Sequence, residues 1–462
     1  MWKSSNPGLR SPAKFLIPSM LPCWILSCWI LSCLLLDSGA MAETRRERNL
    51  VPPGTAAYSE ASLEAVQDGK AVGRVQLSEP VVIAVAAKPE GWGFFQFPRI
   101  WRDGDGTMRV SWNMQPDSIK SYGSHNSGDA VSSDGGKSWR ILSETTDRTR
   151  GLLLPGGDRI SIVTPKALKA EELDLPRPVA ETGQEHPKGT RVFYRLHEMP
   201  ANRQGVFLKR LRRGQGDWVE EHATLDDPKA LRYSLGGLVP LLWWGDLRIA
   251  ADGSIIAGIY PGYSLNDDGS VDPKCGVNFY RSTDEGRSWR FQGRIPYQPD
   301  LGADPKGEKR MGYTEPAFEI LADGTYVCVL RSSDNEGVGP MYLSVSNDHG
   351  VTWSRPKVFT RTGVLPQLLQ LENGVVVLSS GRPGVQVRFS FDGSGATWTD
   401  PFEMLPYYGS TEEASCGYTN LLATGPDRGL MVYADFQYVS ETKEIRKAIK
   451  VREIIVTPLS PN

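Results

Sequence analysis

The stretch Ser282-Thr283-Asp284-Glu285-Gly286-Arg287-Ser288-Trp289 decides the fold of this chain. It follows the spacing Ser-x-Asp-x-Gly-x-x-Trp. An aspartate in a tight turn accepts hydrogen bonds from nearby backbone N–H groups, and glycine supplies the positive φ that the turn needs. The tryptophan covers the turn with a large apolar face. The pattern therefore predicts a stapled β-hairpin whose residues are structural.

The same pattern recurs along the chain. Three further copies span residues 132–139, 346–353 and 390–398, the last with one extra residue, and a degenerate copy ends at Trp218. We call these stretches Asp boxes. Four spaced copies in one chain are improbable by chance, so they indicate a repeated hairpin. The structural aspartates of the boxes are Asp134, Asp284, Asp348 and Asp392.

A second repeat alternates with the boxes and consists of a turn glycine before a β-rich run. Its six glycines are Gly106, Gly157, Gly253, Gly324, Gly374 and Gly429. Six hairpin signals predict an all-β, six-bladed β-propeller with four strands in each blade. A pair of β-sandwiches also explains short strands, but not two repeats that alternate in step. A stretch rich in proline and glutamate, about residues 167–190, is expected to form a surface loop.

Composition narrows the class of protein. The chain has 462 residues, 40% hydrophobic and 23% charged, with a formal charge of −2. This balance suits a packed globular protein, and the absence of a basic stripe argues against a nucleic-acid partner. Three cysteines, Cys275, Cys328 and Cys416, lie in the body of the chain. They are expected to be buried thiols with at most one disulfide bond among them.

The N-terminus has the features of a signal peptide over residues 1–42. Lys3, Arg10 and Lys14 precede an apolar run over residues 15–36, and Ala40-Met41-Ala42 offers a cleavage site after Ala42. Cleavage predicts a secreted or periplasmic protein without a remaining membrane span. An uncleaved membrane anchor is the alternative, because the run is long for a signal peptide. Residues 43–75 are expected to form an N-terminal extension with a short helix near 61–66, and residues 76–462 the propeller.

The four boxes and six hairpins resemble the sialidase (neuraminidase) superfamily of Asp-box, or BNR-repeat, proteins, over about Val81 to Val456. The resemblance implies a glycan partner and an exo-acting glycoside hydrolase that releases a terminal acidic sugar. The boxes themselves mark the fold, because function belongs to the site built on it.

The chemistry of an acidic sugar explains the residues that the resemblance assigns. A carboxylate on the sugar calls for arginines and would repel a carboxylate nucleophile, whereas a tyrosine activated by a glutamate avoids the repulsion. Glu315, in Glu315-Pro316-Ala317-Phe318-Glu319, resembles the family's base. Tyr418, in Gly417-Tyr418-Thr419, resembles its nucleophile. Arg331 and Arg382 match two of its three substrate-binding arginines.

Two positions depart from the family pattern. The gap-free match to the first arginine falls on Gln96 in Phe95-Gln96-Phe97-Pro98, and Arg99 or Arg102 would replace it through a shift in strand register. The expected acid aspartate is also missing. His125 lies near its place, between Asp117 and Asp129, and its ordinary pKa suits an acid. These departures predict a relaxed or changed substrate.

The sequence predicts no cofactor and no metal site. The histidines lack metal-binding spacing, and the acidic turns at 103–106 and 266–269 are interpreted as hairpin turns rather than Ca²⁺ loops. The adjacent pair Trp243 and Trp244 could stack on a sugar ring, but a pleated strand directs only one of them inward, and packing in the core is the more common role of such residues.

Three functional hypotheses follow. The first is the sialidase-like hydrolase with Tyr418 and Glu315. The second is a non-catalytic glycan-binding propeller that keeps the fold without the complete catalytic set. The third is a glycosidase or lyase acting on another uronate-containing polysaccharide, with His125 as acid or base.

Overall fold

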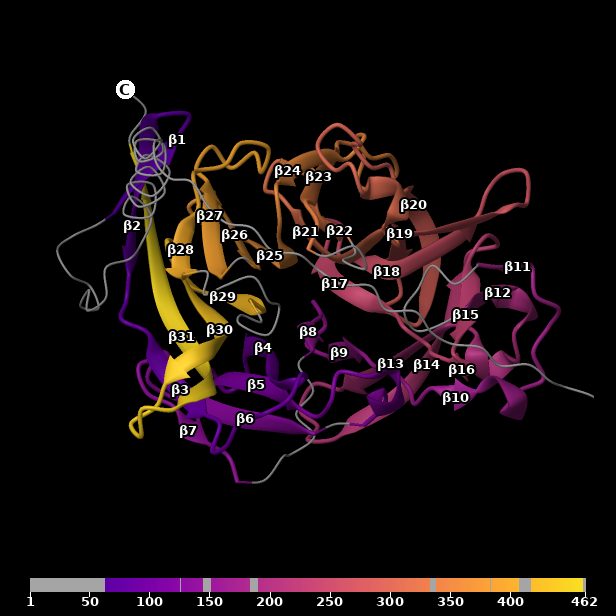
Figure 1. Ribbon diagram of the computed structural model, residues 1–462, viewed down its shortest axis with the longest axis horizontal. Helices are drawn as coiled ribbons and strands as arrows, with labels where there is room; N and C mark the ends of the chain where they lie inside the picture. The colour runs from indigo at the N-terminus through magenta and orange to yellow at the C-terminus, as the bar shows by residue number, and fades with distance from the viewer. Residues whose placement is uncertain are drawn as a thin grey trace, which may run out of the picture. The chain divides into compact units, whose positions relative to one another are not determined.

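The chain is an all-β protein. The computed structural model describes residues 63–124, 126–143, 151–182, 190–332, 338–382, 384–406 and 417–459 (Figure 1). Strands make up the regular structure of these ranges, together with five short 3₁₀ turns: η1 (Ile119–Ser121), η2 (Ala170–Glu172), η3 (Leu196–Glu198), η4 (Ala201–Arg203) and η5 (Gly307–Lys309). Among these residues no helix is long and apolar enough to cross a membrane.

Three sheets are simple four-stranded antiparallel meanders, as tight turns between short strands favour. The first contains β4 (Phe94–Arg102), β5 (Met108–Met114), β6 (Ser127–Ser132) and β7 (Arg140–Ile141). The second contains β21 (Tyr313–Ile320), β22 (Tyr326–Ser332), β23 (Met341–Ser346) and β24 (Lys357–Thr360). The third contains β25 (Val364–Gln370), β26 (Val376–Gly381), β27 (Val385–Ser390) and β28 (Phe402–Leu405).

An eight-stranded sheet consists of two such meanders joined edge to edge. One half contains β17 (Trp244–Ile249), β18 (Ile255–Leu265), β19 (Val271–Ser282) and β20 (Ser288–Ile295). The other contains β8 (Leu152–Leu153), β9 (Arg159–Ile162), β13 (Val206–Leu211) and β14 (Trp218–Asp226). A short parallel pairing of β14 with β20 connects the halves.

The two ends of the described chain meet in one sheet. It contains β29 (Thr419–Gly425), β30 (Arg428–Val439), β31 (Ile445–Pro458), β2 (Lys70–Leu77) and β1 (Leu63–Gln67), and β3 (Val81–Val85) also pairs with β31. The helix expected near residues 61–66 is wrong, because Leu63–Gln67 pairs with β2. Regular structure thus starts within the stretch expected as an extension.

The stretch expected as a surface loop contributes to an additional sheet. Its five strands are β10 (Leu168–Lys169), β11 (Ala180–Glu181), β12 (Arg191–Arg195), β15 (Leu231–Leu235) and β16 (Leu238–Val239). The expected loop is therefore wrong in part, because β10, η2 and β11 lie within it.

Turn glycines separate the first two strands of five meanders. Gly106, Gly157, Gly253, Gly324 and Gly374 all have φ between 81° and 94°, which favours glycine there. The sixth prediction needs correction. Gly429 lies inside β30, and the turn before it is formed by Pro426 and Asp427.

The Asp boxes lie between the third and fourth strands of their meanders and form the predicted hydrogen bonds. In the box of Asp348, Oδ1 accepts from Thr352 N at 2.8 Å and from Ser346 Oγ at 2.8 Å. The box tryptophan Trp353 donates from Nε1 to Gly350 O at 3.1 Å. The boxes of Asp134, Asp284 and Asp392 repeat this arrangement.

The core lies between neighbouring sheets, and the first strands of successive sheets contact one another. β17 contacts β21, β21 contacts β25, β25 contacts β29 and β29 contacts β4. Figure 1 shows these strands at the inner edges of their sheets. Of the three cysteines, Cys275 and Cys328 are free and buried, and Cys416 lies outside the described residues.

Candidate active site

The tyrosine and glutamate expected to act together do lie together. Tyr418 directly precedes β29, and Glu315 lies near the start of β21. Tyr418 Oη is 3.5 Å from Glu315 Oε1 and 3.5 Å from Arg331 Nη1. The phenol thus lies between a carboxylate, which can accept its proton, and a guanidinium, which can stabilise the phenolate.

A bulge directs Glu315 to this place. The pairing of β21 with β22 shifts between Thr314 and Ala317, and Glu315 has φ 44°. Bulges redirect side chains, and backbone strain of this kind is concentrated at functional sites. Glu315 Oε2 accepts hydrogen bonds from Arg331 Nη1 at 2.6 Å and from Leu365 N at 3.1 Å. Leu365 has φ 40° at a bulge in β25, so two bulged strands fix one carboxylate.

Arg382 covers the other side of the phenol. It follows β26 with φ 47° and is 5% exposed. Its Cζ lies 5.5 Å from the centre of the Tyr418 ring and 5.1 Å from that of Trp92. Phe97 contacts Tyr418 with ring centres 4.7 Å apart. The tyrosine ring thus contacts both a cation and an aromatic ring.

Two glycines bring Tyr418 beside Arg382. A Cβ on Gly381 would lie 2.2 Å from Gly417 Cα, and one on Gly417 would lie 2.8 Å from Arg382 N. Gly417 also has φ 65°. The end of β26 and the residues before β29 therefore approach so closely that only glycine fits at either position.

Gln96 does not line an open site. It is 0% exposed, and its Oε1 accepts a hydrogen bond from Gly93 N, which ties the carboxamide to its own loop. Arg99, three residues later, is exposed. Desolvation by the surrounding protein lowers the pKa of Arg99, and the nearby Asp246 and Tyr260 oppose this shift. Of the two candidates on β4, Arg99 is thus the accessible one.

Of the acid candidates, His125 and Asp117 fall between β5 and β6 in the sequence, and Asp129 lies within β6. His125 falls outside the described residues. Asp117 is exposed, and its Oδ2 accepts from Trp92 Nε1 at 3.2 Å, which links it through Trp92 to Arg382. Asp129 accepts from Ser127 Oγ, and burial raises its pKa.

An aromatic row extends from the pair, and the sequence analysis identified only Trp244 in it, not Tyr260 or Tyr122. Tyr260 is close enough to Glu315 and Tyr418 for their charges to act on it, and burial with these charges raises its pKa well above the ordinary value. Its hydroxyl therefore stays protonated. Trp244 packs edge to face on Tyr260 at 5.8 Å and on Tyr122 at 5.1 Å. Trp243 instead packs in the core against Trp289.

A repeat position was the available signal for Tyr260. Arg331 lies seven residues after its turn glycine, Gly324, and Tyr260 lies seven residues after Gly253. Thr164 lies seven residues after Gly157, and its Oγ1 accepts from Trp244 Nε1 at 2.7 Å. Equivalent positions in successive hairpins thus face the same region.

The acidic turns bond to themselves. Asp105 Oδ1 accepts from Thr107 N at 2.9 Å, and Asp268 Oδ1 accepts from Ser270 N at 2.9 Å and Oγ at 2.6 Å. Within the described ranges, no group of three or more His, Cys, Asp or Glu side chains has a metal-binding arrangement. The acidic turns are thus hairpin turns.

Comparison with known proteins gives similarity in structure alone. No protein-family model and no curated protein matches the sequence. A protein of unknown function from Dyadobacter fermentans is 17% identical with a TM-score of 0.55, over 83% of this chain and 99% of that one.

Two glycosidase structures match less well. A Penicillium chrysogenum alpha-L-arabinanase complexed with arabinobiose is 14% identical, with a TM-score of 0.44 over 85% of this chain and 98% of that one. A Trypanosoma rangeli sialidase complexed with 2,3-difluorosialic acid is 13% identical, with a TM-score of 0.41 over 86% of this chain and 59% of that one. What the comparisons show is an all-β fold shared with the Dyadobacter protein.

Proposed function

We propose that the protein is an exo-acting glycoside hydrolase that releases a terminal acidic sugar, with Tyr418 as nucleophile and Glu315 as its base. The observation that carries the proposal is the position of Tyr418 Oη, 3.5 Å from both Glu315 Oε1 and Arg331 Nη1. A buried tyrosine packed for structure alone has no need of a strained glutamate and a guanidinium at its hydroxyl.

The reaction proceeds in two steps, the formation of a glycosyl-tyrosine and its hydrolysis. Tyr418 Oη attacks the anomeric carbon and gives its proton to Glu315, while the glycosidic bond breaks and an acid protonates the leaving oxygen. Water then attacks the anomeric carbon of the glycosyl-tyrosine and gives a proton to the deprotonated acid, the bond to Tyr418 Oη breaks, and the released phenolate takes its proton back from Glu315. Arg382 and Arg331 provide positive charge for the carboxylate of the sugar. We assign the role of the acid to His125. Asp117 is the alternative acid with which His125 is to be compared.

Two further parts of the proposal concern the whole chain. We count six blades, with β4, β8, β17, β21, β25 and β29 as their inner strands. The strand order and the contacts along the series β17, β21, β25, β29 and β4 support this count. We also propose export through the N-terminal segment with cleavage after Ala42, on the strength of its sequence.

The test is hydrolysis of methylumbelliferyl glycosides of sialic acid and of hexuronic acids by the purified protein. Tyr418→Phe should lower kcat by about 10³-fold or more, because no other oxygen occupies its place. Tyr438→Phe, at a tyrosine on β30 that contacts Lys450, is the matched control and should leave kcat unchanged.

A covalent intermediate supplies a second readout. A fluorinated glycosyl fluoride of the sugar that is hydrolysed should label the protein once, and peptide mass spectrometry should place the label on Tyr418. Turnover that Tyr418→Phe leaves intact, or a label elsewhere, contradicts the proposed nucleophile.

The complete burial of Gln96 favours a second candidate function, that of a glycan-binding propeller without catalysis. With Gln96 0% exposed, β4 offers no arginine at the position where the family has its first. Binding of acidic oligosaccharides by calorimetry, with no product after prolonged incubation, would support this alternative over the hydrolase.

A further inference from the structure

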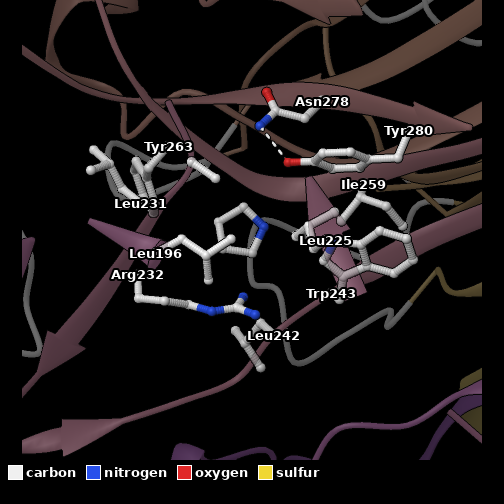
Figure 2. Close-up of a pocket in the computed structure, with 12 residues that line it drawn as sticks. Leu196, Leu225, Leu231, Arg232, Leu242, Trp243, Ile259, Tyr263, Asn278 and Tyr280 are labelled. Atoms are coloured by element: carbon white, nitrogen blue, oxygen red, sulfur yellow. Dashed lines mark hydrogen bonds between the residues drawn. The ribbon is translucent and has the colours of Figure 1, made fainter. Parts of the chain in front are cut away.

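A cavity away from Tyr418 contains unpaired hydrogen-bond donors. It lies between the additional sheet and the β18–β19 hairpin and has a volume of about 20 Å³ (Figure 2). Its lining combines aliphatic side chains, Leu231, Leu242 and Ile259 among them, with the polar side chains of Arg232, Asn278 and Tyr280. A cavity of this size holds one water molecule or one small ion.

Arg232, on β15, is the one cationic side chain that lines this cavity, and it is 8% exposed. Its Nη2 donates to Gly205 O at 2.7 Å, and its Nε has no hydrogen-bond partner. In the described part of the chain, no carboxylate forms an ion pair with it. Burial lowers its pKa to about 10, so it remains protonated at neutral pH. A buried guanidinium without a counter-ion is costly.

Trp243 supplies a second donor. It lines the same cavity and is 6% exposed, and its Nε1 also has no partner. Figure 2 shows Arg232 and Trp243 among the side chains that surround this cavity. Two unfilled N–H donors, one of them charged, call for a species that accepts hydrogen bonds.

Asp227, which binds the lining residue Tyr280, directs its carboxylate elsewhere. Asp227 Oδ2 accepts from Tyr280 Oη at 3.0 Å, and Tyr280 Oη in turn accepts from Asn278 Nδ2 at 3.1 Å. Asp227 also accepts from Lys229 N at 3.0 Å. Its charge is thus directed to its own loop and to Tyr280.

We propose that this cavity binds a monoatomic anion, chloride under ordinary conditions, held by Arg232 Nε and Trp243 Nε1. The small volume, which suits about one water-sized species, favours a monoatomic anion over a polyatomic one such as phosphate. Water is the rival occupant, because Asn278 Oδ1 also lacks a partner and could accept from it. Water, however, leaves the charge of Arg232 without compensation.

Thermal unfolding in chloride and in gluconate at equal ionic strength tests the proposal. The Tm should rise by about 2 to 4 °C as chloride replaces gluconate from about 1 to 100 mM, because an anion that binds only the folded state stabilises it. Arg232→Gln should remove this dependence. Arg388→Gln, at a largely buried arginine outside the cavity, should retain it.

Crystals of the unaltered protein soaked in bromide provide an independent test that does not depend on the folding of a variant. We expect one anomalous peak between Arg232 and Trp243. Equal Tm values in the two salts, or density for water without an anomalous peak, would overturn the proposal.

Discussion

Each of the four Asp-box tryptophans donates the same kind of hydrogen bond, from its Nε1 to the carbonyl of the box glycine. The four side chains differ in burial. Trp289 is 0% exposed and packs against Ile160 and Tyr280, whereas Trp139 is half-buried. Truncation of a fully buried aromatic residue removes apolar contacts and leaves a cavity. The same substitution in the two boxes should therefore differ in cost.

We expect Trp289→Ala to lower the free energy of unfolding by about 3 to 5 kcal/mol, because the site cannot collapse fully around the loss. Trp139→Ala, its matched partner, should cost clearly less. Urea unfolding followed by far-UV circular dichroism measures both. Equal costs would mean that the box hydrogen bond, not burial, determines the contribution.

The carboxylate of a box should make stability depend on pH. Hydrogen bonds from Thr352 and Ser346 lower the pKa of Asp348 to about 2, against an ordinary value of 3.8. Because the folded state has the lower pKa, this stabilisation is complete above pH 3.8 and is lost as the pH falls towards 2. Asp348→Asn should reduce stability at pH 7. It should also make the urea midpoint less dependent on pH between about pH 3.8 and pH 2. If the urea midpoint of the variant changed with pH as steeply as that of the unaltered protein, this assignment would be contradicted.

Residues at bulges are the ones that sequence patterns place poorly. Strict alternation predicts which faces Gln96 and Arg99 present, but the β4–β5 pairing shifts twice between Phe94 and Arg99. Phe95 and Phe97 both take positive φ, which alternation cannot anticipate. Tyr418 and Glu315 were predictable because motifs identify them without reference to strand register.

At the level of elements, the approach of β26 to the segment before β29 sets the geometry of the candidate site. Gly381→Ala would place a Cβ 2.2 Å from Gly417 Cα and push Tyr418 away from Arg382. Hydrolysis, measured on the substrate found for the protein, should fall by about 10-fold or more, because small displacements of reacting groups are costly. Gly216→Ala, where nothing lies within 4 Å, is the control. Full activity in Gly381→Ala would show that the approach has no role in positioning.

Hairpins were predictable from their turns, whereas edge strands were not. Glycine and the box residues have local reasons for their positions, so the sequence alone locates most meanders. β1 pairs with its neighbour β2, but β2 has its other partner, β31, far away in the sequence. The additional sheet likewise depends on pairing between β12 and β15, whose intervening residues contain other strands. Such long-range partners leave no local pattern.

At the scale of the whole described chain, β31 joins the beginning to the end. It pairs with β30, with β2 and with β3. Val456 is 0% exposed in this strand, and Val75 is its partner on β2. Val456→Asp should therefore destabilise the protein by about 3 kcal/mol or more through an unpaired buried charge. Ile445→Asp, at a 57% exposed position of the same strand, should cost less than about 0.5 kcal/mol. Chemical denaturation of both variants tests whether the pairing of β31 with β2 stabilises the protein. Similar denaturation midpoints for the two variants would contradict this role.

The strand pairing places boxes and catalytic candidates at opposite ends of their sheets. Ser346 of a box pairs with Tyr326 at the start of β22, and Arg331 lies five residues further along that strand, about 17 Å away. Ser390 pairs with Val376 in the same way, far from Arg382. The box side is thus the side by which the protein can be anchored. A biotin or dye attached at an exposed box residue such as Lys137 or Arg287 would hold the molecule on a sensor with the Tyr418 side facing the solution.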